Sequence, residues 1–238
     1  MSGHSKWATI HRQKESNDAK KGAIFTKLAA AITVAVKEGR GLQLALEKAK
    51  QYNMPKENIQ RALDRVAGAD GVELEEVMYE GFGPGGGAII VEAMTDNKLR
   101  TAQAVRVVFE KNGGTMGGSG AVSYLFEQKG ELRIRNPIRQ AQGEQELGDN
   151  DELKIIDLNV EEIVKGEGEW IVYCHKDKTF EIKESHEKME YKIDGVGLVM
   201  KPMTLVDGEA GNLIEQLEGL DDIHEVWTNY PAERDQHA

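Results

Sequence analysis

Residues 87–95 read GAIIVEAMT, a short run of small and β-branched apolar side chains that carries a single charge. Such a run predicts a strand. A helix is expected to follow it, capped at Thr95 or Asp96. Residues 112–114, Asn-Gly-Gly, end that helix, and residues 121–126 predict another strand, so the segment forms a β-α-β unit. The buried face of the helix is expected to comprise Leu99, Ala102, Val105, Val108 and Phe109.

The β-α-β order stops at residues 136–150, which are rich in Gln, Gly and Glu and have no apolar period. It resumes near the C-terminus, where Leu213, Leu217 and Leu220 predict a helix and residues 223–228 a strand. We expect this tail to complete the sheet that the β-α-β unit begins, as in a split ferredoxin-like domain. The acidic residues between them then form an insertion, with strands expected at 169–174 and 196–200.

The N-terminal block is predicted to be entirely helical. Apolar residues from Ile24 to Ala35 recur every three or four positions, which predicts a helix that ends near Glu38. Residues 39–41, Gly-Arg-Gly, separate it from a second helix, and a third begins near Pro55. The chain is therefore expected to be an α+β protein in which an all-helical domain precedes a split ferredoxin-like α/β domain that carries a second α/β domain inserted in it. The expected boundaries are 1–75 for the basic helical domain, 76–130 plus 206–238 for the split domain and 131–205 for the acidic insertion.

Charge is distributed very unevenly along the chain. Residues 1–66 contain 13 Lys and Arg against six Asp and Glu, a net charge of +7, whereas the remaining 172 residues carry −18. A basic head on an acidic body favours a polyanionic partner such as DNA or RNA, bound in one orientation. The alternative is that the basic residues only form a solvated helix face.

Composition restricts the other classes of function. No apolar run approaches 18 residues, and residues 1–7, MSGHSKW, lack the apolar core of a secretory signal, so we expect a cytoplasmic protein without a membrane partner. The single cysteine, Cys174, excludes an intrachain disulfide and a cysteine metal cluster. No coiled-coil heptad indicates an obligate dimer, and a monomer is expected.

Catalytic and cofactor motifs are weak. Gly81, Gly83 and Gly86 match G-x-G-x-x-G, but a strand follows them, whereas a dinucleotide site requires a helix, so they predict a turn. The six histidines show no zinc-binding spacing, and there is no G-x-S-x-G nucleophile motif. The sequence predicts a non-enzymatic protein with no cofactor and no metal.

A glycine-rich loop, GGTMGGSG at 113–120, has two interpretations. Its backbone N–H groups can surround a phosphate or another ligand. The glycines can equally allow another part of the backbone to approach closely. The candidate residues of this loop are Gly113, Gly114, Gly117, Gly118 and Gly120.

The basic head supplies the candidate nucleic-acid contacts. Its Lys and Arg side chains neutralise phosphates, and Trp7 among them offers either a stacking face or an anchor in the helical core. Glu57 and Asp64 share the outer face of the third helix with its arginines, which weakens that face as a phosphate site. Nothing resembles a helix that reads base edges, so recognition of shape or backbone is expected. The candidates are Lys6, Trp7, Arg12, Lys14, Lys20, Lys21, Lys27, Lys56 and Arg61.

Several long segments resemble the YebC/TACO1 family. They are GHSKWATI (3–10), DAKKGAIFTKL (18–28), NMPKENIQRAL (53–63), YEGFGPGG (79–86), TDN (95–97), GGTMGGSGAV (113–122) and VWTN (226–229). The resemblance implies a helical domain followed by two α/β domains, one inserted in the other. Bacterial members are commonly described as DNA-binding transcriptional regulators, and members related to TACO1 as translation factors that act on the ribosome and assist polyproline stretches.

The resemblance also transfers basic contacts, and two departures affect them. The contacts fall on Lys6, Lys14, Lys20, Lys21, Lys27 and Lys56. The usual basic run after the first motif is thinned to His11-Arg12-Gln13-Lys14, and the family's loop between the first two long helices is shortened to residues 39–41.

Two functions from different classes of nucleic-acid protein are therefore expected, with a third as an alternative. The first is a DNA-binding transcriptional regulator. The second is a ribosome-associated translation factor that binds ribosomal or transfer RNA. The third is a protein-interaction module whose basic head docks onto its own acidic body.

Overall fold

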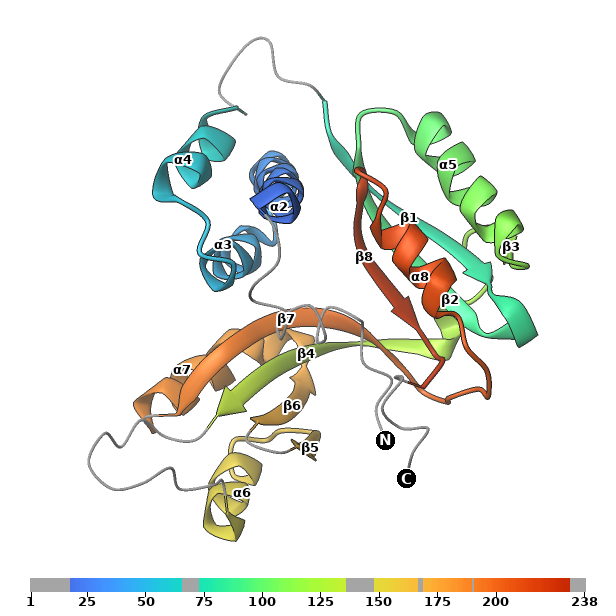
Figure 1. Ribbon diagram of the computed structural model, residues 1–238. Coiled ribbons are helices and arrows are strands. Elements are labelled where there is room, and N and C mark those ends of the chain that lie inside the picture. The colour runs from blue at the N-terminus through green and yellow to red at the C-terminus, as the bar shows by residue number, and fades with distance from the viewer. Residues whose placement is uncertain (1–17, 66–72, 136–147, 167–168, 190, 232–238) are drawn as a thin grey trace. The chain divides into compact units, whose positions relative to one another are not determined.

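The computed structural model describes residues 18–65, 73–135, 148–166, 169–189 and 191–231 (Figure 1). The chain divides into two compact units, of which the first comprises the residues up to Glu127 and from Lys201 onward, and the second comprises Gln128–Met200. The predicted fold class is confirmed, since N-terminal helices are followed by two antiparallel sheets. The finer division of the first unit at residue 75 stays a prediction.

Three helices form the head of the first unit: α2 (Asp18–Glu38), α3 (Leu42–Gln51) and α4 (Lys56–Asp64). Leu28, Ile32, Ala49 and Ala62 pack between them and are almost wholly buried. The frequent alanines let the helices approach closely. Met94 from the adjoining sheet belongs to the same cluster, so the helical core continues onto one face of that sheet.

The sheet of the first unit has the order β3-β1-β2-β8. The predicted strand is β2 (Ala88–Thr95), which pairs antiparallel with β1 (Glu75–Phe82) along its whole length and with β8 (Ile223–Thr228) on its other side. Helix α5 (Lys98–Lys111) then leads to β3 (Thr115–Met116), which pairs with β1, and neither β1 nor β3 was predicted from the sequence. The tail supplies α8 (Gly211–Glu218) and β8, as predicted.

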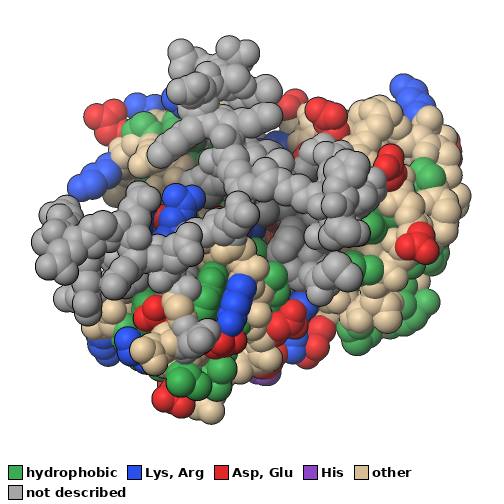
Figure 2. Space-filling view, turned by 60° about the horizontal axis from the view of Figure 1, so that its bottom comes forward, with side chains coloured by type: hydrophobic (Ala, Val, Ile, Leu, Met, Phe, Trp, Pro, Cys, Tyr) green, Lys and Arg blue, Asp and Glu red, His purple; other side chains and the backbone are tan. Residues whose placement is uncertain are grey.

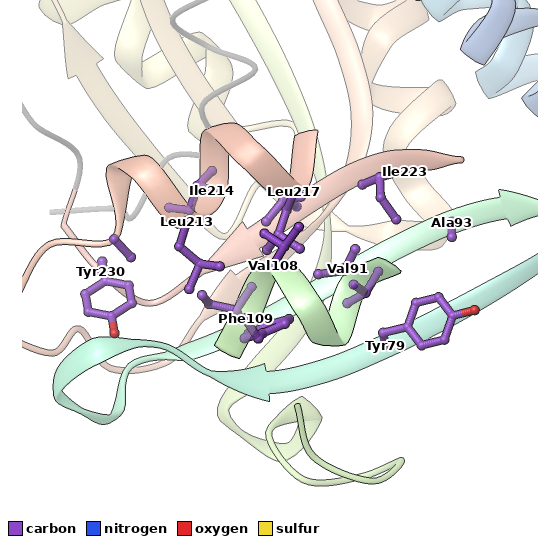
Figure 3. Close-up of a cluster of buried hydrophobic side chains, with 14 residues drawn as sticks. Tyr79, Val91, Ala93, Val108, Phe109, Leu213, Ile214, Leu217, Ile223 and Tyr230 are labelled. Atoms are coloured by element: carbon purple, nitrogen blue, oxygen red, sulfur yellow. The ribbon is translucent and has the colours of Figure 1, made fainter. Parts of the chain in front are cut away.

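The two faces of this sheet have different coverings. Side chains alternate between the faces of a strand. Val91 and Ala93 therefore point toward α5 and α8, where Phe109 and Leu213 meet them in a closed apolar cluster (Figure 3). Glu92 and Met94 point the other way, toward the head.

The glycine motif at 81–86 forms the turn between β1 and β2, as predicted. Position 87 requires glycine, because a Cβ atom there would lie only 2.2 Å from the nearest atom of the Tyr230 ring. The Gly87 N–H donates to the Tyr230 hydroxyl, which itself donates to the Pro84 carbonyl. The segment is thus a packed turn closed by the C-terminal tail.

Two details of the predicted helix at residue 96 are wrong. Its N-cap is Asn97, whose side chain accepts from the Arg100 N–H at 3.0 Å, while Thr95 accepts from the Asn97 N–H. Leu99 is 84% exposed and does not join the buried face. It lies two positions before Thr101, where the buried stripe begins, and two positions place a side chain on the opposite side of a helix.

The predicted strand at 121–126 is also wrong. Residues Ser123–Leu125 form a 3₁₀ turn, and strand β4 (Phe126–Arg135) begins only after it. The N–H groups of Val122 and Ser123 bond to the Glu80 carboxylate. They are therefore not available to pair with a neighbouring strand.

The second unit contains its own sheet, with the order β5-β6-β4-β7. Its other elements are α6 (Asp149–Ile156), β5 (Glu162–Gly166), β6 (Glu169–His175), α7 (Thr179–Lys188) and β7 (Lys192–Pro202). The predicted strands at 169–174 and 196–200 correspond to β6 and to part of β7. Leu132, Ile155, Val172 and Ile182 fill the core. No helix among the described residues is long and apolar enough to span a membrane.

Candidate nucleic-acid interface

The predicted contact residues fall into three groups. Lys6, Trp7, Arg12 and Lys14 lie outside the described residues, and Lys20 lies in α2 with its side chain outside the description. Lys21, Lys56 and Arg61 are exposed, whereas Lys27 is half-buried. The structure thus places only part of the predicted set at the surface.

The outer face of α4 carries both signs of charge. Arg61 lies 3.7 Å from Glu57, and Gln60 donates to Asp64 at 2.8 Å. Lys56, at the start of the helix, is exposed. On the face that Figure 2 shows, Lys and Arg side chains likewise lie among Asp and Glu side chains. The outer face of α4 is therefore not continuously positive.

Lys27 contacts the body of the first unit. Its ammonium donates to the backbone carbonyl of Glu218, at the end of α8, at 2.6 Å. Burial lowers the pKa of Lys27, although the carboxylates of Glu218 and Asp221 act in the opposite direction. This lysine fastens α2 to the sheet layer, a role that its charge alone does not reveal.

Lys48 makes a buried ion pair with the same layer, which the sequence did not predict. Its ammonium lies 2.5 Å from the carboxylate of Glu225 in β8, and the two side chains are only 13% and 6% exposed. A glutamate in the middle of β8 was the feature that could have indicated this pair, because all residues of that strand are buried and a buried carboxylate needs a partner. Lys27 and Lys48 together define the basic joint, by which the head binds the sheet.

Ionisable groups on the sheet side of the basic joint are strongly perturbed. Glu92 is the cross-strand partner of Glu225, so two carboxyl groups face the head together. Burial raises the pKa of Glu92 to about 8, an effect that Lys48 opposes and Glu225 reinforces. Burial, with Lys48 and Lys27 nearby, lowers the pKa of His224 to about 3. At neutral pH the joint therefore holds a protonated Glu92 and a neutral histidine.

Glu92→Gln is expected to make stability less sensitive to pH. Since the folded pKa of Glu92 exceeds its ordinary 4.5, the wild type loses stability as pH rises from about 4.5 to about 8, by at most about 1.4 kcal/mol per pH unit. The glutamine variant lacks this loss. Urea unfolding at several pH values, with the exposed Glu215→Gln as the control, measures the difference. If the difference in unfolding free energy between Glu92→Gln and the wild type stays the same from pH 5 to pH 8, the raised pKa of Glu92 is contradicted.

The glycine-rich loop surrounds a carboxylate of the protein itself. Glu80 in β1 is 6% exposed, and its two oxygens accept from the N–H groups of Gly120, Val122 and Ser123 at 2.7–2.8 Å. Gly120 has a φ of +83°, a left-handed conformation that glycine adopts without strain. Of these three donors only Gly120 belongs to the loop 113–120, and the N–H groups of Gly113, Gly114 and Gly117 are bonded to backbone carbonyls. We call the three bonds to the Glu80 carboxylate the Glu80 latch.

The other glycines of the loop serve turns and packing. Gly113 follows the end of α5, and Gly114 lies directly against the Phe82 carbonyl. The Gly117 N–H donates to the Glu80 carbonyl, and Gly118 is exposed at the tip. Close approach of neighbouring segments, the second of the two interpretations, therefore accounts for most of the loop.

The described residues offer no other chemical centre. They contain no group of three His, Cys, Asp or Glu side chains that could hold a metal ion. Cys174 is buried, and burial raises the pKa of its thiol, which disfavours the reactive thiolate.

Comparison with known proteins covers nearly the whole chain. Residues 5–69 match the model of the TACO1/YebC protein N-terminal domain, and residues 74–230 match that of the TACO1/YebC second and third domain. The "Probable transcriptional regulatory protein TTE1135" of Caldanaerobacter subterraneus subsp. tengcongensis is 42% identical, over 98% of this chain and 99% of the relative. The "Probable transcriptional regulatory protein YrbC" of Bacillus subtilis is also 42% identical, over 97% and 99%.

A solved structure has the same architecture. It is that of the conserved hypothetical protein Aq1575 from Aquifex aeolicus, with a TM-score of 0.77 and 36% sequence identity. The superposition covers 92% of this chain and 96% of that one.

Proposed function

Because the chain belongs to the TACO1/YebC family, we propose that it is a non-enzymatic regulator of gene expression that binds nucleic acid through its basic helical head. The observation that carries the proposal is the opposite charge of head and body, +7 against −18. A polyanion gains Coulomb energy at the head and loses it at the body, so binding is oriented. Duplex DNA is the first target, since both curated relatives described above are named as probable transcriptional regulatory proteins.

The ribosome is the second candidate target. Helices α2, α3 and α4 pack their apolar faces against each other and the sheet, and the exposed face of α4 carries Glu57 and Asp64 beside its basic residues. Carboxylates beside the basic residues repel phosphates, which weakens this face as a helix that lies in a DNA groove. Recognition of folded RNA by shape and backbone fits this surface better.

Sedimentation of a cell lysate through a sucrose gradient separates the two targets. Co-migration with ribosomal particles that RNase abolishes and DNase does not would support the translation role. Heavy complexes that DNase removes would support the transcriptional role. Migration of the protein as a free species under both treatments would contradict the proposal as a whole.

Charge reversal at exposed head lysines is expected to weaken binding. In the variant Lys21→Glu with Lys56→Glu, affinity should fall at least about tenfold, and the slope of log K against log salt should flatten by about two, because two phosphate contacts are lost. Lys27 is left unchanged because it belongs to the basic joint. The measurement is fluorescence anisotropy with labelled duplex DNA and with a labelled RNA hairpin.

The matched control reverses the same amount of charge elsewhere. Lys178→Glu with Lys188→Glu alters two exposed lysines of the second unit. It should leave the salt slope as in the wild type. If both double variants weaken binding equally, only net charge matters and the head is not the binding surface.

A further inference from the structure

Tyr124 is unusual among the aromatic residues of this protein. Its side chain is 65% exposed, and it is the one aromatic residue among those described that is largely exposed. It lies in the 3₁₀ turn Ser123–Leu125, directly after the glycine-rich loop. Exposing a ring of this size forgoes a large burial energy. The position therefore requires an explanation other than packing.

The backbone around Tyr124 is held in place from three sides. The Glu80 latch binds the N–H groups of Val122 and Ser123. The Leu125 N–H donates to the Val122 carbonyl, and the Leu125 carbonyl accepts from Met203 N–H, both at 2.9 Å. The ring thus projects from a fixed turn, which reduces the entropy that a ligand must overcome on binding.

The chain segments next to Tyr124 contain no charged residue, although the body as a whole is strongly acidic. Residues 112–126 contain no Asp, Glu, Lys or Arg, and neither do residues 202–206, which reach this turn through Met203. Met203 is itself 60% exposed, and Gly118–Gly120 at the tip of the loop are exposed and carry almost no side chain. The nearest carboxylate that the latch places here, that of Glu80, is 6% exposed and is bonded to three backbone N–H groups, so it is largely shielded from a ligand on the ring.

We propose that Tyr124 is a stacking platform for an unpaired base of a nucleic acid, with Glu80 as the residue that positions it. An aromatic ring stacks on any base, and each stacked base contributes appreciably to the affinity for single strands. The flat exposed ring, the small side chains of the loop and the lack of charge suit a base and its sugar better than a charged peptide. The inference rests on the proposed function and adds a contact outside the basic head.

The test compares Tyr124→Ala and Tyr124→Phe with the wild-type protein. Short labelled single strands of RNA and of DNA and a fully paired duplex are titrated at several salt concentrations. Tyr124→Ala should bind the single strands about tenfold more weakly, with an unchanged salt slope because no phosphate contact is lost. Tyr124→Phe should bind like the wild type. A strand that carries 2-aminopurine should lose fluorescence on the wild type and on Tyr124→Phe.

The control is Leu99→Ala, which removes an exposed apolar side chain elsewhere in the first unit. It should bind like the wild type. Binding by Tyr124→Ala within about twofold of the wild type would overturn the inference, and so would an equal loss for Tyr124→Phe. If Tyr124→Ala binds nucleic acid normally and loses a protein partner instead, the ring serves a protein interface.

The two proposals fail differently. If the head does not bind nucleic acid, the variant Lys21→Glu with Lys56→Glu will have the same salt slope as the wild type. If Tyr124 does not stack on a base, Tyr124→Ala will bind single strands with the affinity of the wild type, whatever result the head variant gives. Thermal unfolding of each variant shows that the fold is intact, since Tyr124 is exposed and its loss should not lower the melting temperature.

Discussion

Lys48→Met is expected to destabilise the protein by about 3–5 kcal/mol, because it leaves Glu225 buried without its countercharge. In the wild type the ammonium and carboxylate are 2.5 Å apart and are largely shielded from water. Glu92, the cross-strand partner of Glu225, has a raised pKa and is protonated at pH 7, so it adds no charge repulsion. Urea unfolding at pH 7 measures the change.

Two further variants make this prediction specific. Lys50→Met removes an exposed lysine of the same helix, 67% exposed and paired with Glu47, and should cost less than about 1 kcal/mol. The double variant Lys48→Met with Glu225→Leu removes both charges and should recover most of the lost stability. A double variant no more stable than Lys48→Met alone would show that the pair does not act as a unit.

The basic joint changes how the charge of the head is interpreted. Counting lysines and arginines predicts a basic surface of 13 residues within positions 1–66. In the structure Lys27 and Lys48 face the sheet, and Arg61 lies beside Glu57. Docking of the head on its own body, the third alternative from the sequence, therefore takes place in part. It uses two lysines and leaves others, such as Lys21 and Lys56, exposed for a partner.

Local patterns in the sequence predicted the elements well, and for a physical reason. The apolar period of α2 and the apolar run of β2 reflect interactions between residues close in the chain. The errors near α5 are local, since Asn97 caps the helix through Arg100, whereas the error at residues 121–126 comes from a side chain that bonds at a distance. Glu80 and Val122 are 42 residues apart, and Lys48 and Glu225 are 177 apart. No spacing rule connects such pairs. The sequence therefore indicated which residues are basic, but it could not indicate which residues contact each other.

The glycine-rich loop illustrates the same limit. From the sequence, its N–H groups were equally suited to a phosphate and to close packing. The deciding residue, Glu80, directly precedes the glycine motif at 81–86, for which the sequence predicted only a turn. Because β1 and β3 are neighbours in the sheet, the carboxylate reaches the loop. The anion that the loop holds is therefore supplied by the chain, and the loop is left as a rigid support for Tyr124.

Glu80→Ala is expected to cost about 3 kcal/mol of stability and to release the loop. It removes the acceptor for three backbone N–H groups, of which that of Val122 is buried and cannot turn to water. Urea unfolding measures the loss, and hydrogen exchange should show faster exchange at Val122 and Ser123. The exposed Glu110→Ala on α5 is the control and should change stability by less than about 0.5 kcal/mol.

The pH dependence of this variant provides an independent test of the Glu80 latch. Burial alone would raise the pKa of Glu80, but the three N–H donors outweigh it and lower the pKa below its ordinary 4.5. A carboxylate with a lowered pKa stabilises the fold fully above about pH 4.5 and stops doing so as pH falls through the lowered value. The stability difference between wild type and Glu80→Gln, which keeps one acceptor oxygen, should therefore shrink in acid. A difference that stays constant down to about pH 3 would mean that the charge of Glu80 does not hold the loop.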